Sequence, residues 1–361
     1  MRLTKPLCTA VVVAVAQVSF AAVLQPTSVR KLDTAAAAVA WLNDQTLLLA
    51  DSRGISTFRP ATGESTNVIP ASPVPDGLPD PLSVSTDGVS VVANNGFART
   101  AYACRVADKK RIFARSSPRF VVIDIAVWRD RLYVLGWPAD LHGAVNPDGV
   151  AVWTGPVTGR FDQLLPLHRI QSGPESVSIF NDSIATYGGA LTVERDGTVD
   201  VVTAAEPGVF QYSTSGRVLR TLGTGMSELV QHRMHDINFT YGSNALARYQ
   251  RVINAHPTID GLVATDDGPA LVVRVPRGDT IGWELWYPDA TRTRARVTLG
   301  VTRKGPFGHL SCDARGRELA CVYQRATTER EGLQEDPGKL STVLVRFTLP
   351  KLAPSSAIAA K

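Results

Sequence analysis

The chain has 361 residues, of which 44% are apolar and 20% charged, with a formal net charge of +5. This balance is typical of a folded globular protein and excludes collagen, a coiled coil and a disordered chain. The basic residues are dispersed along the chain, so nucleic acid is not an expected partner.

The first 21 residues have the pattern of a secretory signal peptide. Arg2 and Lys5 precede an apolar run from Leu7 to Phe20, and small residues surround Ala21. The run is short for a membrane-spanning helix, and an uncleaved anchor is the alternative. We therefore expect an exported mature protein, in a bacterial periplasm or outside the cell, without a transmembrane helix after cleavage. Cleavage removes two basic residues and leaves 36 basic and 33 acidic ones, a net charge of +3.

One unit then recurs along the chain: an alternating apolar stretch, a tight polar turn and a second alternating stretch. This pattern is the signature of a β-hairpin. Six copies are found, at Val39–Asp51, Leu82–Asn94, Ile125–Trp137, Val177–Gly189, Gly261–Val275 and around Cys312. Their turns centre on Asp44, Asp87, Asp130, Asp182, Asp267 and Gly316.

A second hairpin follows most of these copies, so the repeating unit is a four-stranded antiparallel sheet of about 43–52 residues. Such a sheet is unstable alone and must bury its faces on its neighbours. Radial stacking of these sheets predicts an all-β fold, a six-bladed β-propeller in one domain over residues 24–350. The strand Thr27–Asp33 is expected to close the last blade beside Ser341–Leu349, and residues 351–361 to form a flexible tail.

The interval between the fourth and fifth turns is nearly twice the others. Within it, Ser227 is suited to cap a helix, Leu246 to Ile253 have helical spacing, and Pro257 ends the run. We interpret residues 226–256 as a helical insertion after the fourth blade. The alternative is a seventh blade formed by Val209 to Asn254.

The pair Cys312 and Cys321 flanks the last turn symmetrically. With Gly316-Arg317 as a two-residue loop, Arg315 faces Glu318 and the two cysteines lie directly opposite each other. In an oxidising compartment this register predicts a disulfide, although a metal or redox pair is the alternative reading.

Three groups of residues are weak candidates for a site. The first is a candidate divalent-metal set in the insertion, at His232, His235, Asp236 and His256, with a solvated helix surface as the alternative. The second is a long polar loop with Asp140, His142, Asn146 and Asp148, which is also ordinary turn chemistry. The third is an aromatic pair, Trp283 and Trp286, either a carbohydrate platform or packing between blades. No cofactor is indicated with any strength, and no catalytic motif is found.

The repeat, above all VFQYSTSGRVLRTLG (Val209 to Gly223), resembles the six-bladed propeller superfamily of NHL-repeat and TolB-like proteins. That stretch and FGHLSCDARGRELACVYQ (Phe307 to Gln324) also resemble uncharacterised exported bacterial propeller proteins. The resemblance implies the fold and carries over no catalytic residue. We therefore expect a module that binds a protein or ligand in the periplasm or cell envelope. The alternatives are a metal-dependent, lactonase-like hydrolase and a carbohydrate-binding propeller.

Overall fold

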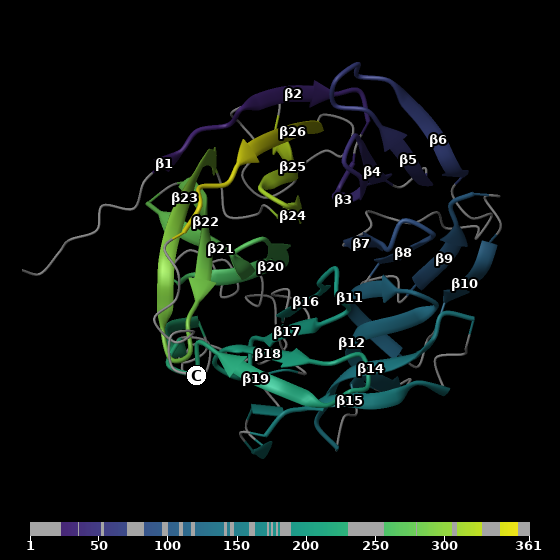
Figure 1. Ribbon diagram of the computed structural model, residues 1–361, viewed down its shortest axis with the longest axis vertical. Coiled ribbons are helices and arrows are strands. Elements are labelled where there is room, and N and C mark those ends of the chain that lie inside the picture. The colour runs from purple at the N-terminus through teal and green to yellow at the C-terminus, as the bar shows by residue number, and fades with distance from the viewer. Residues whose placement is uncertain are drawn as a thin grey trace, which may run out of the picture.

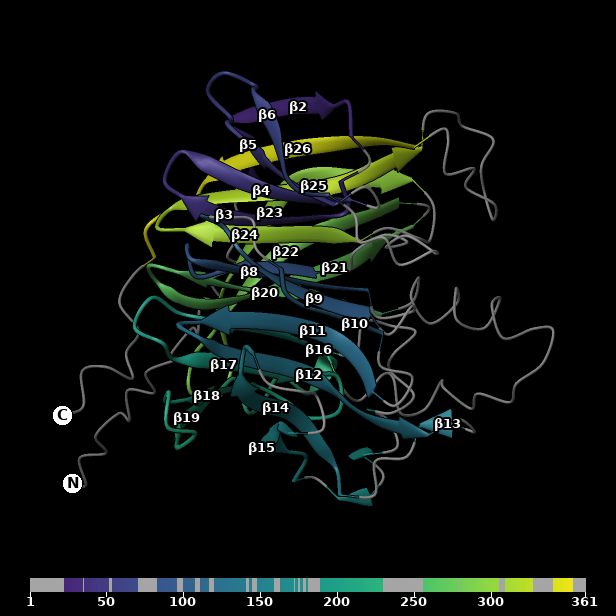
Figure 2. The same cartoon turned by 90° about the vertical axis from the view of Figure 1, so that its right-hand side faces the viewer.

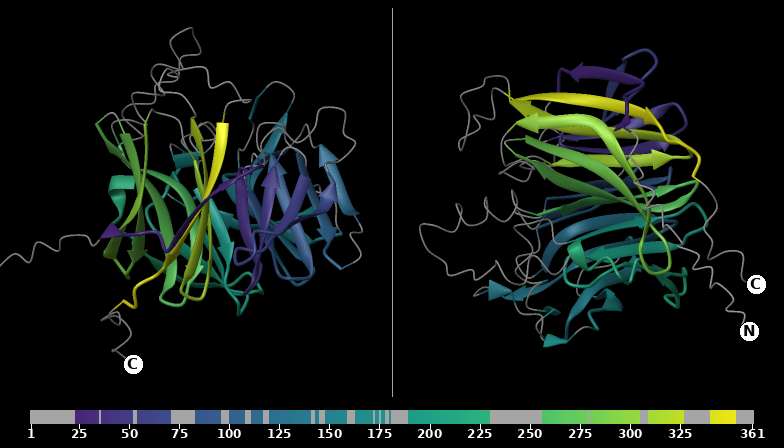
Figure 3. Two further views of the ribbon diagram at one scale, coloured as in Figure 1. Left: turned by 90° about the horizontal axis from the view of Figure 1, so that it is seen from above. Right: turned by 90° about the vertical axis from the view of Figure 1, so that its left-hand side faces the viewer.

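The computed structural model contains six separate antiparallel sheets arranged in a ring (Figure 1). It describes residues 23–34, 36–51, 54–70, 83–95, 100–107, 111–116, 120–140, 143–144, 148–158, 163–171, 173–174, 176–177, 180, 189–229, 256–278, 280–304, 309–326 and 340–352. Each sheet is one blade, and its strands run between the two faces of the ring (Figure 3). The predicted six-bladed β-propeller is confirmed.

The first three blades follow the chain order, from an inner strand at the axis to an outer strand at the rim. Blade one comprises β3 (Ala38–Asn43), β4 (Thr46–Asp51), β5 (Gly54–Phe58) and β6 (Ser65–Pro70). Blade two comprises β7 (Ser83–Thr86), β8 (Ser90–Asn95), β9 (Thr100–Arg105) and β10 (Arg111–Ser116). Blade three comprises β11 (Phe120–Trp128), β12 (Arg131–Asp140), β14 (Val150–Pro156) and β15 (Leu165–Arg169), with the short β13 (Gly143–Ala144) paired to β12.

The other three blades complete the ring. Blade four comprises β16 (Gly189–Val193), β17 (Val199–Thr203), β18 (Val209–Tyr212) and β19 (Val218–Leu222). Blade five comprises β20 (Thr258–Thr265), β21 (Gly268–Arg277), β22 (Thr280–Pro288) and β23 (Thr293–Lys304). Blade six comprises β24 (Leu310–Arg315), β25 (Glu318–Ala326), β26 (Leu340–Thr348) and β2 (Ser28–Leu32).

The N-terminal strand closes the ring as the sequence predicts. β2 pairs antiparallel with β26, from Ser28 opposite Arg346 to Leu32 opposite Thr342. The preceding β1 (Val23–Leu24) pairs in parallel with β23 on the rim of blade five, which the sequence did not predict. The first strands of the chain therefore tie together the last two blades, and Figure 2 shows β2 beside β26 in side view.

The hydrophobic core lies between the blades. Buried apolar residues among those described form six clusters, and each cluster joins two neighbouring blades. Alternation along a strand explains this arrangement, because successive side chains point to opposite faces of a sheet. In β22, Trp283 packs towards blade six, whereas Trp286 packs towards blade four. No blade has a complete core of its own, so the ring is the stable unit.

Blade four differs from the sequence-based expectation. The sequence predicted a hairpin at Val177–Gly189 with its turn at Asp182. In the structure Val177 and Phe180 have helical backbone, so the start of this segment is not a blade strand. Asp182 lies outside the described residues. Blade four instead begins at Gly189, where Leu191–Ala204 supplies the hairpin. Apolar alternation alone did not separate these two neighbouring candidates.

The alternative of seven blades is wrong, because β18 and β19 are the third and fourth strands of blade four. The helical insertion stays a prediction for most of its length. Its start is a single 3₁₀ turn, η3 (Ser227–Leu229), and residues 230–255 lie outside the described part of the chain.

The cysteine register is confirmed. Cys312 lies opposite Cys321 in the β24–β25 hairpin, with their Cα atoms 4.1 Å apart and a disulfide between them. Gly316 adopts a φ of 63°, a conformation that glycine takes without steric cost and that the tight turn requires. The disulfide therefore fastens the inner hairpin of blade six, which is also the blade that closes the ring.

Candidate functional site

A channel runs through the centre of the ring, and all six inner strands line it. Its volume is about 700 Å³, within the range of small-molecule sites. The inner strands β3, β7, β11, β16, β20 and β24 contact one another in that order and close the circle. Figure 1 views the ring with the labelled inner strands around its centre.

Each inner strand is the edge of its sheet, so the backbone N–H groups that point away from the sheet lack partners within the blade. Polar side chains of the preceding blade accept hydrogen bonds from several of them. Asp313 Oδ2 accepts from the Trp41 N–H at 2.6 Å, and Asp124 Oδ2 accepts from the Leu191 N–H at 2.9 Å. These carboxylates link blade six to blade one and blade three to blade four.

Hydroxyl groups make the same link elsewhere in the ring. Ser311 Oγ accepts from the Val39 N–H at 3.2 Å, and Ser85 Oγ accepts from the Val127 N–H at 3.4 Å. A neutral side chain can therefore bridge two inner strands, and the carboxylates are not required for this purpose.

Burial in the channel wall perturbs two of the carboxylates. It raises the pKa of Asp124 to about 6, against the hydrogen bonds from Leu191, Ser83 and Ile125. It also raises the pKa of Asp313 to about 6, against the N–H groups of Trp41 and Ala314 and the charge of Arg315. Both groups therefore titrate about two units above an exposed aspartate.

A third carboxylate forms a corner of the channel between blades five and six. Asp260 Oδ2 accepts hydrogen bonds from Trp283 Nε1 at 2.7 Å and from the Leu310 N–H at 3.3 Å. The buried Arg274 lies behind it, with Nε 3.8 Å from Asp260 Oδ1. His309 lines the channel beside them, and burial, together with the charge of Arg274, lowers its pKa although Asp260 opposes the shift. The imidazole is therefore neutral at pH 7.

The mouth at the hairpin turns has a mixed charge. Arg315 of blade six forms an ion pair with Asp44 of blade one. Together with the more distant Arg195, it holds the pKa of Asp44 below its usual value. Glu194 lines the same mouth and lies against the buried Asp200, and burial raises the pKa of both carboxyls. This pair therefore retains a proton more readily than isolated carboxyls do.

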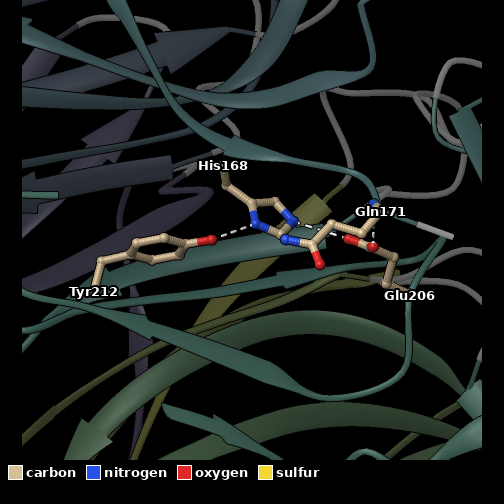
Figure 4. Close-up of polar contacts among 4 residues, drawn as sticks. All are labelled: His168, Gln171, Glu206 and Tyr212. Atoms are coloured by element: carbon tan, nitrogen blue, oxygen red, sulfur yellow. Dashed lines mark hydrogen bonds and ion pairs between the residues drawn. The ribbon is translucent and has the colours of Figure 1, made fainter. Parts of the chain in front are cut away.

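A second polar network links blades three and four (Figure 4), and its His168, Glu206 and Tyr212 side chains are buried. His168 on β15 contacts the Tyr212 hydroxyl through Nδ1 at 2.5 Å and Glu206 Oε2 through Nε2 at 2.9 Å. Glu206 Oε1 accepts from the Gln171 N–H at 2.6 Å. The His168, Glu206 and Tyr212 residues are at most 3% exposed. Burial, together with the charge of Glu206, raises the pKa of Tyr212 to about 12. The set resembles an acid–base relay, but its burial makes it a link between blades.

The sequence-based candidates only partly fall within the described residues. His142, Asn146, His232, His235 and Asp236 lie outside them, so these candidates stay predictions. The backbone of Asp140 pairs with Gly143 at the end of β12, whereas Asp148 is exposed and its carbonyl accepts from Arg169 at 2.7 Å. His256 is half-buried just before β20. Across the described part of the chain, no group of three or more His, Cys, Asp or Glu side chains could hold a metal ion.

The two tryptophans are inside the protein. Trp283 is fully buried against Asp260, and Trp286 is 2% exposed with Arg296 stacked 3.7 Å from its ring centre. A carbohydrate platform requires an exposed ring face, which neither tryptophan offers in the structure. Their positions correspond to the alternative reading, packing between blades.

The channel residues Asp124, Asp260 and Asp313 were missed by sequence reasoning. A signal exists, because each is a lone acidic residue within an inner strand, in VVIDIAV, TIDGLV and HLSCDA. A buried carboxylate is costly, and its presence at such a position indicates either a structural bridge or a ligand.

Comparison with known proteins gives fold likeness only. No known protein family and no curated protein matches the chain. Among solved structures, the β-propeller domain of Myceliophteria thermophila Cps50 (Swd1) matches with a TM-score of 0.47 and 8% identity, covering 90% of this chain and 100% of that one. U3-55K gives 0.45 and 12%, covering 89% and 99%, and streptogramin B lyase gives 0.44 and 11%, covering 88% and 97%.

These likenesses are too distant to carry an argument about activity. Among the described residues, no helix is long and apolar enough to cross a membrane. The assignment rests on the chain's own six sheets, their ring of inner strands and the closing N-terminal strand. The chain is a six-bladed β-propeller.

Proposed function

We propose that this protein is an exported binding module that holds a small polar ligand in its central channel. The observation that carries the proposal is the channel itself, about 700 Å³ in volume with carboxylate, hydroxyl and imidazole groups on its wall. Concave cavities of this size in which polar groups converge are the usual form of ligand sites in proteins.

Two sequence features support export to the periplasm or cell envelope. The first is the leader-like segment at residues 1–21, and the second is the disulfide-forming register of Cys312 and Cys321. Expression of the full chain with its leader, followed by fractionation and N-terminal sequencing, tests this part. A mature chain that starts near residue 22 in the periplasmic fraction is expected. Intact protein confined to the cytoplasm would contradict export.

The binding function is tested by thermal-shift screening of small polar metabolites against the mature chain. Ala264 on β20 is half-buried and lines the channel, so Ala264→Trp is expected to fill the cavity and abolish the stabilisation by any hit. Ser65→Trp, at an exposed position of the outer strand β6, is the matched control and should retain it. Hits that bind both variants equally would place the ligand elsewhere and contradict the proposal.

A further inference from the structure

The channel is negatively charged inside a basic protein. Six acidic and three basic side chains line it, a net charge of −3 when all are ionised, whereas the chain as a whole carries +5. The three basic residues lie at the hairpin-side mouth, where acidic neighbours balance them. They are Arg129, Arg195 and Arg315, beside Asp87, Asp130 and Glu194.

The inner part of the channel therefore has the carboxylates of Asp124, Asp260 and Asp313 without a basic residue in its lining. Behind the lining, Arg274 offsets the charge of Asp260 in part. Arg315 likewise offsets the charge of Asp313 in part, so a ligand that enters this part meets a net negative charge at neutral pH.

The carboxylates exceed what the fold needs. Ser311 and Ser85 bridge inner strands through a hydroxyl and without burying a charge, and they sit at the same kind of position as Asp124 and Asp313. Burying a charged group costs more than burying a hydroxyl that makes the same hydrogen bond. The extra charge therefore indicates that these carboxylates serve a bound ligand and not only the fold.

Asp260 adds negative charge from inside the channel wall. Its side chain is fully buried, with Oδ2 bonded to Trp283 and Leu310 and Oδ1 facing Arg274. Arg274 Nε lies 3.8 Å from Oδ1, too far for a hydrogen bond, so the guanidinium offsets the charge only in part. Asp260 therefore favours a cation in the channel without contacting it.

The charges are spread over different walls and depths. Asp124 is in blade three and Asp313 in blade six, on opposite sides of the ring. Asp313 precedes its hairpin turn by three residues and Asp124 by five, a difference in depth of about 7 Å at the rise of a strand. A single compact ion reaches one wall, whereas an extended molecule with several ammonium groups reaches both.

We propose that the channel selects a small organic polycation, a diamine or polyamine, whose ammonium groups pair with Asp124 and Asp313 in the negative field that Asp260 strengthens. This inference rests on the proposed binding function and specifies its ligand. The apolar wall between the carboxylates, with Val39, Leu191 and Leu262 in the lining, suits the methylene chain of such a molecule.

The test is calorimetric titration of the mature chain with butylamine, putrescine and spermidine at pH 7.5 and low salt. Affinity should rise about tenfold or more from butylamine to putrescine, because the second ammonium group finds the second carboxylate. It should rise again with spermidine, whose third charge lies in the negative field of the channel. The double variant Asp124→Asn/Asp313→Asn should weaken spermidine binding at least tenfold. Glu64→Gln, which changes an exposed carboxylate outside the channel lining, is the matched control and should leave it nearly unchanged.

A second readout separates ionic pairing from a structural effect of the substitutions. At pH 6 the two aspartates are partly protonated, so spermidine binding to the wild-type chain should release protons. Titration in buffers of different ionisation enthalpy measures this release, and it should disappear in the double variant. If the double variant fails to fold, the wild-type measurement at pH 4.5, with weakened binding expected, replaces it.

Several outcomes would overturn the inference. They are equal affinity for the three amines, unchanged binding by the double variant, or strong binding of Ca²⁺ alone that spermidine does not displace. If a neutral or anionic compound binds, Ala264→Trp abolishes its binding and none of the amines binds, the polycation inference is refuted and the proposed binding function remains. If no compound binds, the result contradicts both.

Discussion

The pH dependence of stability offers a direct test of the buried channel carboxylates. Burial raises the pKa of Asp124 and of Asp313 from 3.8 to about 6. The folded state therefore binds more protons than the unfolded state between pH 4 and 6. The free energy of unfolding contributed by these groups must fall as pH rises through that window and stay low above it.

The magnitude follows from the shifts. Two pKa units correspond to about 3 kcal/mol for each group, and water in the channel reduces this to about 1–2 kcal/mol. The pair should therefore cost the fold about 2–4 kcal/mol between pH 4 and 7. Asp124→Asn/Asp313→Asn removes both titrations, so its stability should change less with pH than that of the wild type. Each aspartate accepts two backbone N–H hydrogen bonds, one on each oxygen, whereas an asparagine has a single acceptor oxygen. Each substitution therefore loses one of these bonds, which costs about 1 kcal/mol at every pH.

Urea denaturation followed by tryptophan fluorescence, at steps from pH 4 to 7.5, measures this difference. Comparison with the wild type cancels the other titrating groups, including His309, whose lowered pKa acts with the opposite sign. Asp44→Asn is the control: the pKa of Asp44 is lowered, so its contribution is lost as pH falls and cannot explain a loss on raising the pH. Parallel pH profiles for the wild type and the double variant would refute the buried-charge account.

Three further outcomes follow from the fold. Replacing Cys312 and Cys321 with serine, or reducing the disulfide, should lower the free energy of unfolding by about 2–3 kcal/mol, the chain-entropy value for so short a loop, and equal stability of the oxidised and reduced chains would contradict this. Tyr212→Phe removes the hydroxyl bonded to His168 and should cost about 1–3 kcal/mol in urea denaturation, with no effect on ligand binding in the channel. Deleting residues 23–32 removes β1 and the closing strand β2, so the chain should lose cooperative unfolding or aggregate, and a soluble monomer of unchanged stability would show that the ring does not need this closure.

The sequence predicted the hairpins and the strands that lack a partner within their own part of the chain. Alternation and turn residues located the hairpins, and symmetric counting around Gly316 placed Cys312 opposite Cys321. Closure by β2 was predictable because two strands, at opposite ends of the chain, each lacked a partner. Blade four was misplaced because Val177–Gly189 and Leu191–Ala204 both carry alternating apolar residues, and only packing in the ring distinguishes them.

The channel site could not be predicted in the same way. Whether Asp124 meets the N–H of Leu191 depends on the relative depth of two blades, which no hairpin pattern encodes. The sequence motifs drew attention to histidines and aromatics because those residue types often carry chemistry. The site residues are instead lone aspartates within inner strands, a signal visible only once each strand is known to be the innermost of its blade.

The structural and the ligand-binding roles of these aspartates make different demands on the same side chain. As a bridge between inner strands, Asp313 needs only to accept the Trp41 N–H, and a protonated carboxyl or a hydroxyl does so without a buried charge. As a ligand site it must be ionised, a state that burial disfavours and a bound cation restores. If the aspartates only bridged inner strands, the protein would be less stable at pH 7 than at pH 5, and nothing would offset this loss of stability. A cationic ligand would recover the stability at neutral pH by binding the folded state alone, so its effect should be largest where the empty channel is least stable.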